Sequence, residues 1–348
     1  MVEYLSGNRI QGSSTKVSEP PQTSWKELAR VVGSSGTSLD TGTFTAKDNL
    51  MILIHSVNGT QMLTYNNDSG ANYANRRNEE GGSDSTNMSS QNNINFTRNA
   101  GEDMFIYGDL VNAASSEKMG VYHQLSDASN TKRQEWAHKW ANTSNQITRV
   151  TLTSDSGNYD ANDQLIVLGC DNDESDSGSV FWQKIADETS TSAGDFTVSF
   201  TAKKYLWVQA SGEADGNNRT SWRWRFNSDS TSGNYKFRRS DEDGSDSHTG
   251  DSYISVADTL GASGQSGNSG NTQVFTNAFI VNPTSYRKLG VYHSTTNQPD
   301  TQGGSSTMDR AETTAMWTNT SEQITSITVT STGDSFPAGL KITVWGSD

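Results

Sequence analysis

The sequence contains little that could hold a fold together covalently or anchor it in a membrane. One cysteine, Cys170, among 348 residues excludes an intrachain disulfide, so stability must come from packed cores. No apolar run approaches the roughly 20 residues of a transmembrane helix, which predicts no membrane insertion. Positive charge is scarce, with 26 Lys and Arg against 40 Asp and Glu. The net charge of −14 disfavours nucleic acids and anionic membranes as partners.

Targeting and coiled-coil signals are also missing. The first seven residues have neither a basic n-region nor an apolar h-region, so we expect synthesis in a cytoplasm without a Sec signal. No heptad pattern is present, which excludes a coiled-coil fibre. Only 31% of the residues are hydrophobic, a proportion compatible with disorder, but 9 Trp, 11 Tyr and 11 Phe argue for a folded protein. Each large aromatic side chain buries on the order of 150–250 Å².

The chain repeats itself. Residues 72–85 match residues 234–247 without a gap, at a shift of 162 (235 − 73 for the two tyrosines). Residues 140–148 match residues 317–325 at a shift of 177 (317 − 140), so the second copy has gained residues, which we place in loops. Each copy has the size of an ordinary domain, and two copies are too few for a solenoid.

The hydrophobic pattern is strand-like along most of both copies. Residues 50–54 form a short continuous apolar run, typical of a buried strand. Trp222, Trp224 and Phe226 alternate with arginines, so the aromatic side chains share one face of a strand. A platform for stacking bases or sugars is one interpretation of this face. Residues 61–65 of the first copy lack both tryptophan and arginine, so we favour an aromatic core face with arginines outside.

Many short strands separated by turn signals predict an all-β protein. We expect two tandem homologous β-sandwich domains, jelly-roll-like, preceded by an extended N-terminal arm. The predicted limits are residues 1–23 for the arm, 24–171 for the first β-sandwich repeat, 172–179 for an acidic linker and 180–348 for the second repeat. Residues 24–32 and 179–187 have a weak helical period and are candidates for one or two helical turns each.

The first 23 residues belong to neither copy. They open with a short semi-apolar stretch that contains Tyr4, Leu5, Arg9 and Ile10. An ordered arm needs a partner, and adding a strand to an open sheet edge is a common way to link subunits. We therefore predict that these four residues act in assembly, on a neighbouring subunit rather than on their own domain.

An acidic loop in the second copy is a candidate metal site. Asp241, Asp243 and Asp246 offer carboxylate oxygens, the ligands that Ca²⁺ prefers. The loop fails the EF-hand pattern because its glycine comes too early. The alternative is a solvated loop that forms local ion pairs with adjacent arginines. Calcium is the one cofactor for which the sequence provides a candidate site.

A pair of arginines precedes the acidic loop in each copy, at matching positions. Because both copies keep the pair, we consider it a candidate for surface recognition. The four residues are Arg76, Arg77, Arg238 and Arg239.

No catalytic signature is present in either copy. His123 and His293 follow Gly-Val-Tyr at matching positions, but no serine or cysteine nucleophile accompanies them in a recognisable motif. We interpret them as histidines hydrogen-bonded at strand ends. Cys170 is replaced by Ser347 in the second copy, which excludes a thiol chemistry common to both. We therefore predict a protein that is not an enzyme.

Several repeated blocks resemble those of known structural proteins. The block Phe/Tyr-Asn-x-Asp-Ser occupies residues 65–69 and 226–230, and Trp-x-Asn-Thr-Ser-x-Gln-Ile-Thr occupies residues 140–148 and 317–325. Together with the opening residues 4–12, these blocks resemble structural proteins of tailed viruses of bacteria or archaea, including environmental sequences. The resemblance implies a virion component such as a tail, fibre, decoration or capsid subunit. It implies no catalytic residues.

The leading hypothesis is a non-enzymatic structural virion protein that self-assembles or docks on a viral particle through its β-domains and arm. Its partners would be copies of itself and other virion proteins, and its location the virion. The first alternative is a receptor- or glycan-binding spike or fibre module, whose partners would be host-surface glycans. The second is a cellular surface filament subunit. A hydrolase is the weakest alternative, because no motif places a pair of carboxylates.

Overall fold

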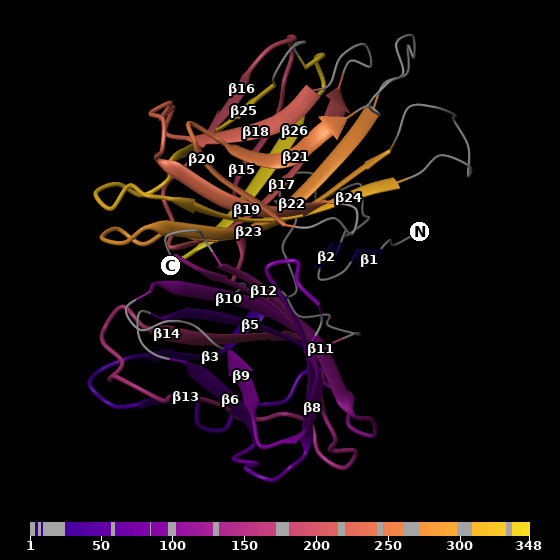
Figure 1. The fold of residues 1–348 in the computed structure, drawn as a ribbon, viewed down its shortest axis with the longest axis vertical. Helices are drawn as coiled ribbons and strands as arrows, with labels where there is room; N and C mark the ends of the chain where they lie inside the picture. The colour runs from indigo at the N-terminus through magenta and orange to yellow at the C-terminus, as the bar shows by residue number, and fades with distance from the viewer. Residues whose placement is uncertain are drawn as a thin grey trace, which may run out of the picture. The chain divides into compact units, whose positions relative to one another are not determined.

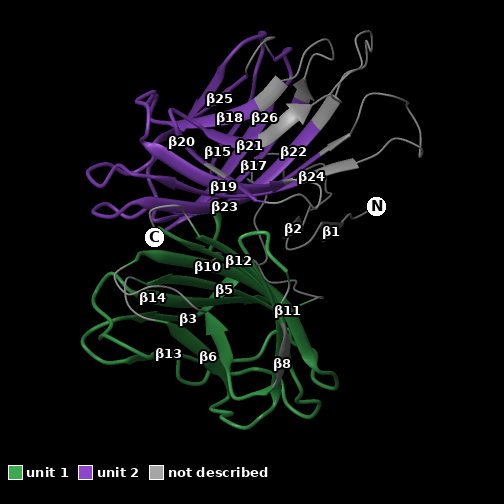
Figure 2. Ribbon diagram, viewed as in Figure 1, with its two compact units in different colours: residues 1–128, 132–183 green, residues 129–131, 184–348 purple. Residues whose placement is uncertain are grey.

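The computed structural model describes residues 4–5, 8–9, 25–56, 60–83, 85–96, 102–127, 132–171, 181–214, 220–241, 246–260, 272–297, 308–331 and 336–348. These residues form strands and turns, with no helix among them. The chain divides into unit 1, residues 1–128 and 132–183, and unit 2, residues 129–131 and 184–348 (Figure 2). Both units are β-sandwiches, which confirms the predicted fold class. The predicted linker lies outside the described residues.

Unit 1 pairs a large sheet with a small one (Figure 1). The large sheet has eight antiparallel strands in the order β3 (Lys26–Val32), β14 (Gln164–Cys170), β5 (Asn49–Ser56), β10 (Met104–Val111), β11 (Lys118–Ser126), β12 (Lys132–Trp140), β7 (Tyr73–Glu79) and β8 (Ser85–Gln91). The small sheet has four strands in the order β4 (Ser38–Asp40), β13 (Val150–Ser154), β6 (Gln61–Tyr65) and β9 (Ile94–Phe96).

Unit 2 repeats this arrangement strand for strand. Its eight-stranded sheet has the order β15 (Gln183–Thr189), β26 (Lys341–Ser347), β17 (Tyr205–Ala214), β22 (Thr272–Val281), β23 (Lys288–Asn297), β24 (Met308–Trp317), β19 (Tyr235–Asp241) and β20 (Ser247–Asp251). Its four-stranded sheet has the order β16 (Phe196–Ser199), β25 (Ser326–Thr330), β18 (Thr220–Phe226) and β21 (Ile254–Leu260). The duplication seen in the sequence is therefore a duplication of a complete sandwich topology.

Each core lies between the two sheets of its own unit. In unit 1, Ile106 of the large sheet and Leu63 of the small sheet belong to one buried cluster. In unit 2, Ile280 and Val329 do the same. Successive strand residues point to opposite faces, so every second side chain of a strand enters the core. This alternation explains how a chain with few hydrophobic residues builds two cores.

The aromatic strand of unit 2 faces inward as expected. The side chains of Trp222 and Trp224 are fully buried, and Phe226 is 1% exposed. The arginines between them take the other face: the Arg223 guanidinium lies 3.7 Å from the centre of the Tyr253 ring. The interpretation as a core face is confirmed, and a stacking platform on these tryptophans is excluded because their rings are not accessible.

The two segments considered for helical turns are strands instead. Residues 26–32 form β3, which pairs with β14 from Gln164 opposite Val32 to Gly169 opposite Lys26. Residues 183–189 form β15 at the matching edge of unit 2. A window of two turns cannot separate a helix from a strand by periodicity alone. Here the neighbouring strand accepts the backbone hydrogen bonds and so decides the structure.

Four of the arm residues fall in a short two-stranded sheet. Strand β1 (Tyr4–Leu5) pairs antiparallel with β2 (Asn8–Arg9), with Tyr4 opposite Arg9. Ile10 and residues 11–23 lie outside the described part of the chain. The contribution of Tyr4, Leu5, Arg9 and Ile10 to assembly therefore stays a prediction.

Candidate functional site

A repeated polar cluster surrounds one aspartate in each unit. In unit 1, the Asp68 carboxylate accepts hydrogen bonds from Trp140 Nε1 at 2.7 Å, from Asn72 Nδ2 at 2.9 Å and from the Gly70 backbone N–H at 2.9 Å. Partial burial acts to raise the pKa of Asp68, but these three hydrogen bonds outweigh it and hold the pKa below its usual value. The carboxylate is therefore occupied in fixing a turn.

Unit 2 repeats the cluster around Asp229. Its carboxylate accepts hydrogen bonds from Trp317 Nε1 at 2.7 Å, Asn234 Nδ2 at 2.8 Å and the Thr231 backbone N–H at 2.9 Å. Burial again opposes ionisation, and the hydrogen bonds again hold the pKa of Asp229 below its usual value. Sequence comparison aligned these aspartates and tryptophans in separate blocks but gave no sign that they meet.

A tyrosine closes each of these turns. The Tyr73 hydroxyl accepts the Tyr65 backbone N–H at 2.8 Å and donates to the Asp68 carbonyl at 3.1 Å. In unit 2, the Tyr235 hydroxyl accepts the Phe226 backbone N–H at 2.9 Å and donates to the Asp229 carbonyl at 3.1 Å. Burial raises the pKa of both phenols well above its ordinary value, so both hydroxyls stay protonated near neutral pH.

A buried lysine occupies matching positions in both units. Lys118 Nζ donates to the carbonyls of Ser116 and Asn142, each at 2.9 Å. Lys288 Nζ donates to the carbonyls of Tyr286 and Asn319, at 3.0 and 2.8 Å. Burial lowers the pKa of Lys288 to about 8. A lowered pKa can mark a nucleophilic amine, but both ammonium groups are already bound by backbone carbonyls and buried, which fits a structural role.

Unit 1 alone contains a buried Tyr–Tyr–His cluster. The Tyr65 hydroxyl lies 2.8 Å from the Tyr122 hydroxyl and 3.0 Å from His138 Nε2. Burial lowers the pKa of His138 to about 3, so the imidazole is neutral at physiological pH. The matching residues of unit 2 are Phe226, Tyr292 and Ala315, and the cluster is therefore not common to both copies.

The four arginines predicted for surface recognition lie in different environments. Arg76 is exposed on β7. The Arg77 guanidinium lies 5.1 Å from the Trp136 ring centre and forms an ion pair with Glu79 at 3.3 Å. Arg238 and Arg239 are only 7% and 8% exposed, and Arg239 Nη1 donates to Ser255 Oγ at 2.8 Å. Surface recognition by the pair in unit 2 is thus wrong, because its side chains are buried.

The remaining sequence-derived sites divide into two groups. Of the proposed calcium ligands, Asp243 and the side chain of Asp241 lie outside the described structure, so calcium binding with Asp246 stays a prediction. His123 and His293 lie inside β11 and β23 rather than at strand ends, which corrects the expected position. The imidazole of His123 stacks on the Tyr107 ring at 6.1 Å between centres.

An apolar patch is exposed on the large sheet of unit 1. It consists of Val111, Met119, Val121 and Ala137, which we name the β10–β12 patch. Val111 pairs with Met119, and Val121 pairs with Ala137, so the four residues share the face opposite the core. Met119 is 61% exposed, Val111 56% and Val121 39%, and Ala137 is also exposed. Within the described chain, only two other large apolar residues, Val32 and Phe275, are exposed to this degree.

Charged side chains border this patch. Arg76 of β7 pairs with Ala137 in the register, which places one predicted recognition residue beside it. Lys139 pairs with Met119, and Lys139 Nζ lies 3.0 Å from a carboxylate oxygen of Glu117. An apolar centre with a charged border is the usual anatomy of a protein–protein contact.

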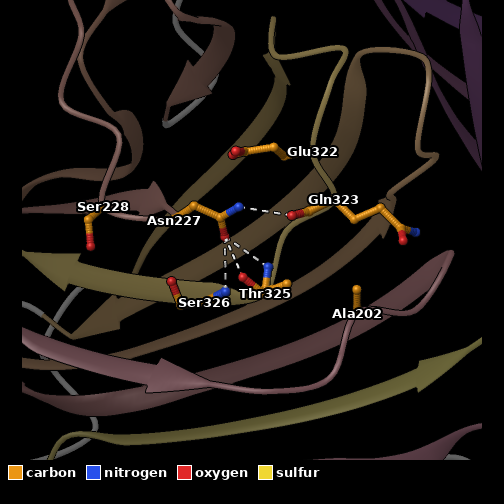
Figure 3. Close-up of a pocket in the computed structure, with 7 residues that line it drawn as sticks. All are labelled: Ala202, Asn227, Ser228, Glu322, Gln323, Thr325 and Ser326. Atoms are coloured by element: carbon orange, nitrogen blue, oxygen red, sulfur yellow. Dashed lines mark hydrogen bonds between the residues drawn. The ribbon is translucent and has the colours of Figure 1, made fainter.

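Unit 2 contains a polar recess of about 560 Å³ at one end of its small sheet (Figure 3). Asn227 lines it and is held by hydrogen bonds: the side-chain Nδ2 donates to the Gln323 carbonyl at 2.9 Å, and Oδ1 accepts the Thr325 and Ser326 backbone N–H groups at 2.8 and 3.2 Å. The other lining residues are Ala202, Ser228, Glu322, Gln323, Thr325 and Ser326. Sequence reasoning missed this recess, because its residues come from three separate segments.

Comparison with known proteins adds little to this geometry. Across the described residues, no helix is long and apolar enough to cross a membrane. No protein-family model matches the chain, and no curated protein matches its sequence. The chain is similar to domains LG4–5 of the mouse laminin α1 chain with 8% identity, covering 91% of this chain and 88% of that one. The TM-score is 0.18, at which the likeness carries no argument about function.

Proposed function

We propose that this protein is a non-enzymatic structural subunit that self-assembles or docks on a viral particle through its β-domains and N-terminal arm. The observation that carries the proposal is the β10–β12 patch of unit 1. Contiguous apolar surface with a polar border is one mark of a protein–protein contact site, so the charged border of this patch favours a protein partner. The partners would be copies of this chain and other particle proteins. The protein would be synthesised in a host cytoplasm and reside in the virion.

The repeated polar groups support the non-enzymatic part of the proposal. Asp68 and Asp229, Tyr73 and Tyr235, and the two buried lysines are among the polar side chains that both units keep in one geometry. Each is held by hydrogen bonds within its own unit. A general acid or base needs a polar atom within reach of substrate. What has been duplicated is therefore the framework of a sandwich rather than a reaction centre.

Isotope-resolved cross-linking tests this proposal. We would mix light and heavy-isotope copies of the full chain at high concentration, treat them with an amine-reactive cross-linker and identify mixed-isotope peptides. Lys139 borders the β10–β12 patch and its side chain is 43% exposed, so it reports directly on that surface. We expect intermolecular cross-links at Lys139 in the wild type.

The matched variant is Met119→Asp, which places a charge at the most exposed apolar position of the patch. We expect it to remove the intermolecular cross-links at Lys139 while leaving cross-links within one chain unchanged. Glu188→Gln, an exposed change in unit 2, is the control and should behave as the wild type. If wild-type Lys139 forms cross-links only within a single chain, the patch is not an assembly contact and the proposal fails.

A further inference from the structure

Asn227, which lines the recess of unit 2, has a counterpart in unit 1 that makes the same hydrogen bonds. In unit 1, Asn66 takes the place of Asn227: Nδ2 donates to the Gln146 carbonyl at 2.9 Å, and Oδ1 accepts the Thr148 and Arg149 backbone N–H groups at 2.9 and 3.1 Å. The backbone framework is thus identical in the two units. Differences between them lie in side chains that the framework does not use.

One such difference removes a cation from the second unit. At the position of Ser326, unit 1 has Arg149, whose guanidinium binds the Asp40 carboxylate through Nε at 2.8 Å and through Nη2. In unit 1, Asp40 pairs with Thr151, and in unit 2, Thr197 pairs with Thr328. Because Thr151 and Thr328 are matching positions of the two copies, Thr197 stands where unit 1 has Asp40. Unit 2 has therefore lost both members of an internal ion pair.

A second difference adds an anion. Glu322 lines the recess where unit 1 has Asn145, and its side chain is exposed. Asn319 Nδ2 lies 3.5 Å from a Glu322 carboxylate oxygen, which is a long and weak hydrogen bond. Among the described residues, the charged group that acts on Glu322 is the Lys288 ammonium, which is buried and donates to backbone carbonyls. The carboxylate is therefore left facing solvent at the edge of the recess.

We propose that this recess binds the guanidinium group of an arginine side chain presented by a partner protein, with the Glu322 carboxylate as counter-ion. A guanidinium brings five N–H donors and no acceptor. The Glu322 carboxylate and the hydroxyls of Ser228 and Ser326 supply acceptors, and carboxylates are the preferred partners of arginine.

The test is an NMR titration of the full chain with N-acetyl-arginine-N-methylamide. We expect saturable shifts of the backbone amides of residues 227–228 and 322–326. The neutral isostere N-acetyl-citrulline-N-methylamide should leave these amides unchanged. Glu322→Asn, which restores the residue of unit 1, should weaken binding roughly 2- to 5-fold, the usual range for an exposed ion pair. Ser326→Arg should abolish it, because the new side chain fills the recess.

Three controls make the outcome decisive. Glu188→Asn, an exposed change outside the recess, should bind as the wild type does, and circular dichroism should show that every variant is folded. Equal shifts with the citrulline probe, or wild-type binding by both recess variants, would overturn the proposal. Agmatine, a small free guanidine, distinguishes the source: if it binds more tightly than an arginine-containing peptide, the partner is not a protein. The inference is independent of self-assembly, because the probe is a small molecule.

Discussion

The indole Nε1 of Trp317 lies 2.7 Å from the Asp229 carboxylate, and the matched pair Trp140 and Asp68 has the same distance. In both units the tryptophan ends a long strand and the aspartate belongs to the turn after a strand of the small sheet. The hydrogen bond therefore links the two sheets of a sandwich. This repeated polar contact is thus a structural one.

Removing this carboxylate should destabilise only the unit that contains it. Asp229→Ala leaves the buried Trp317 N–H without its acceptor, and we expect a loss of about 1.5–3 kcal/mol of unfolding free energy in unit 2. Hydrogen exchange under increasing urea measures each unit separately, which matters because a two-domain chain does not unfold in one step. The exposed Glu188→Ala should have no effect. Equal destabilisation of unit 1 and unit 2 by Asp229→Ala would contradict this account.

Unit 1 should be more sensitive to acid than unit 2. The pKa of His138 is lowered to about 3 by burial, whereas its unfolded value is near 6.5. As the pH falls, His138 therefore takes up its proton in the unfolded state before it does so in the folded state. The contribution of His138 to stability is fully present above pH 6.5 and is lost as the pH falls towards 3. We expect unit 1 to lose on the order of 2 kcal/mol between pH 6.5 and pH 4.5.

Unit 2 supplies the matched control for this acid sensitivity. Tyr65→Phe with His138→Ala gives unit 1 the residues that unit 2 has, Phe226 and Ala315. We expect the double variant to lower the stability of unit 1 at neutral pH, because it leaves a cavity, but to flatten its pH dependence in this window. Stability profiles from hydrogen exchange at a series of pH values provide the measurement. An unchanged slope in the double variant would show that another group controls acid unfolding.

A buried asparagine should be essential in unit 2. Asn282 is fully buried, accepts the Ile324 backbone N–H at 2.7 Å and donates to the carbonyls of Lys203 and Ile324 at 2.9 and 3.2 Å. Asn282→Ala leaves these buried backbone groups without hydrogen-bond partners, so we expect unit 2 to lose about 3 kcal/mol of unfolding free energy. Urea titration monitored by hydrogen exchange tests this value. The exposed Ser199→Ala should leave the unfolding free energy unchanged. An unchanged unfolding free energy in Asn282→Ala would show that this asparagine does not stabilise unit 2.

One turn residue of unit 2 is less favourable than its counterpart. Ser228 has a φ of 57°, in the left-handed region, where unit 1 has Asn67 at the same φ of 57°. Asparagine tolerates this conformation better than serine does. We expect Ser228→Asn to stabilise unit 2 by about 0.5 kcal/mol, an estimate scaled from the known effect of backbone-compatible substitutions. Thermal unfolding of Ser228→Asn measures this gain. Thermal unfolding of Asn67→Ser measures the reverse change, which should lower the stability of unit 1.

The sequence was informative where a local pattern decides the structure. Alternation placed Trp222 and Trp224 on one face, comparison with residues 61–65 favoured the core for that face, and the self-match of the chain predicted two sandwiches. It failed at residues 26–32, where a neighbouring strand overrides a weak helical period. It also gave no sign of the Asp68–Trp140 contact, because the two residues are separated by 72 positions and meet only through sheet register. The recess beside Glu322 could not be predicted either, because its lining residues come from separate segments of the sequence.

The central claim is that this protein works by assembling, and the mass of the full chain in solution tests it most directly. Sedimentation equilibrium over a wide concentration range, with the full chain, with the chain lacking residues 1–23 and with Met119→Asp, measures that mass. We expect the full chain to associate as its concentration rises, and both variants to associate more weakly. If both the full chain and the chain lacking residues 1–23 stay monomeric at the highest concentration, the result contradicts the account.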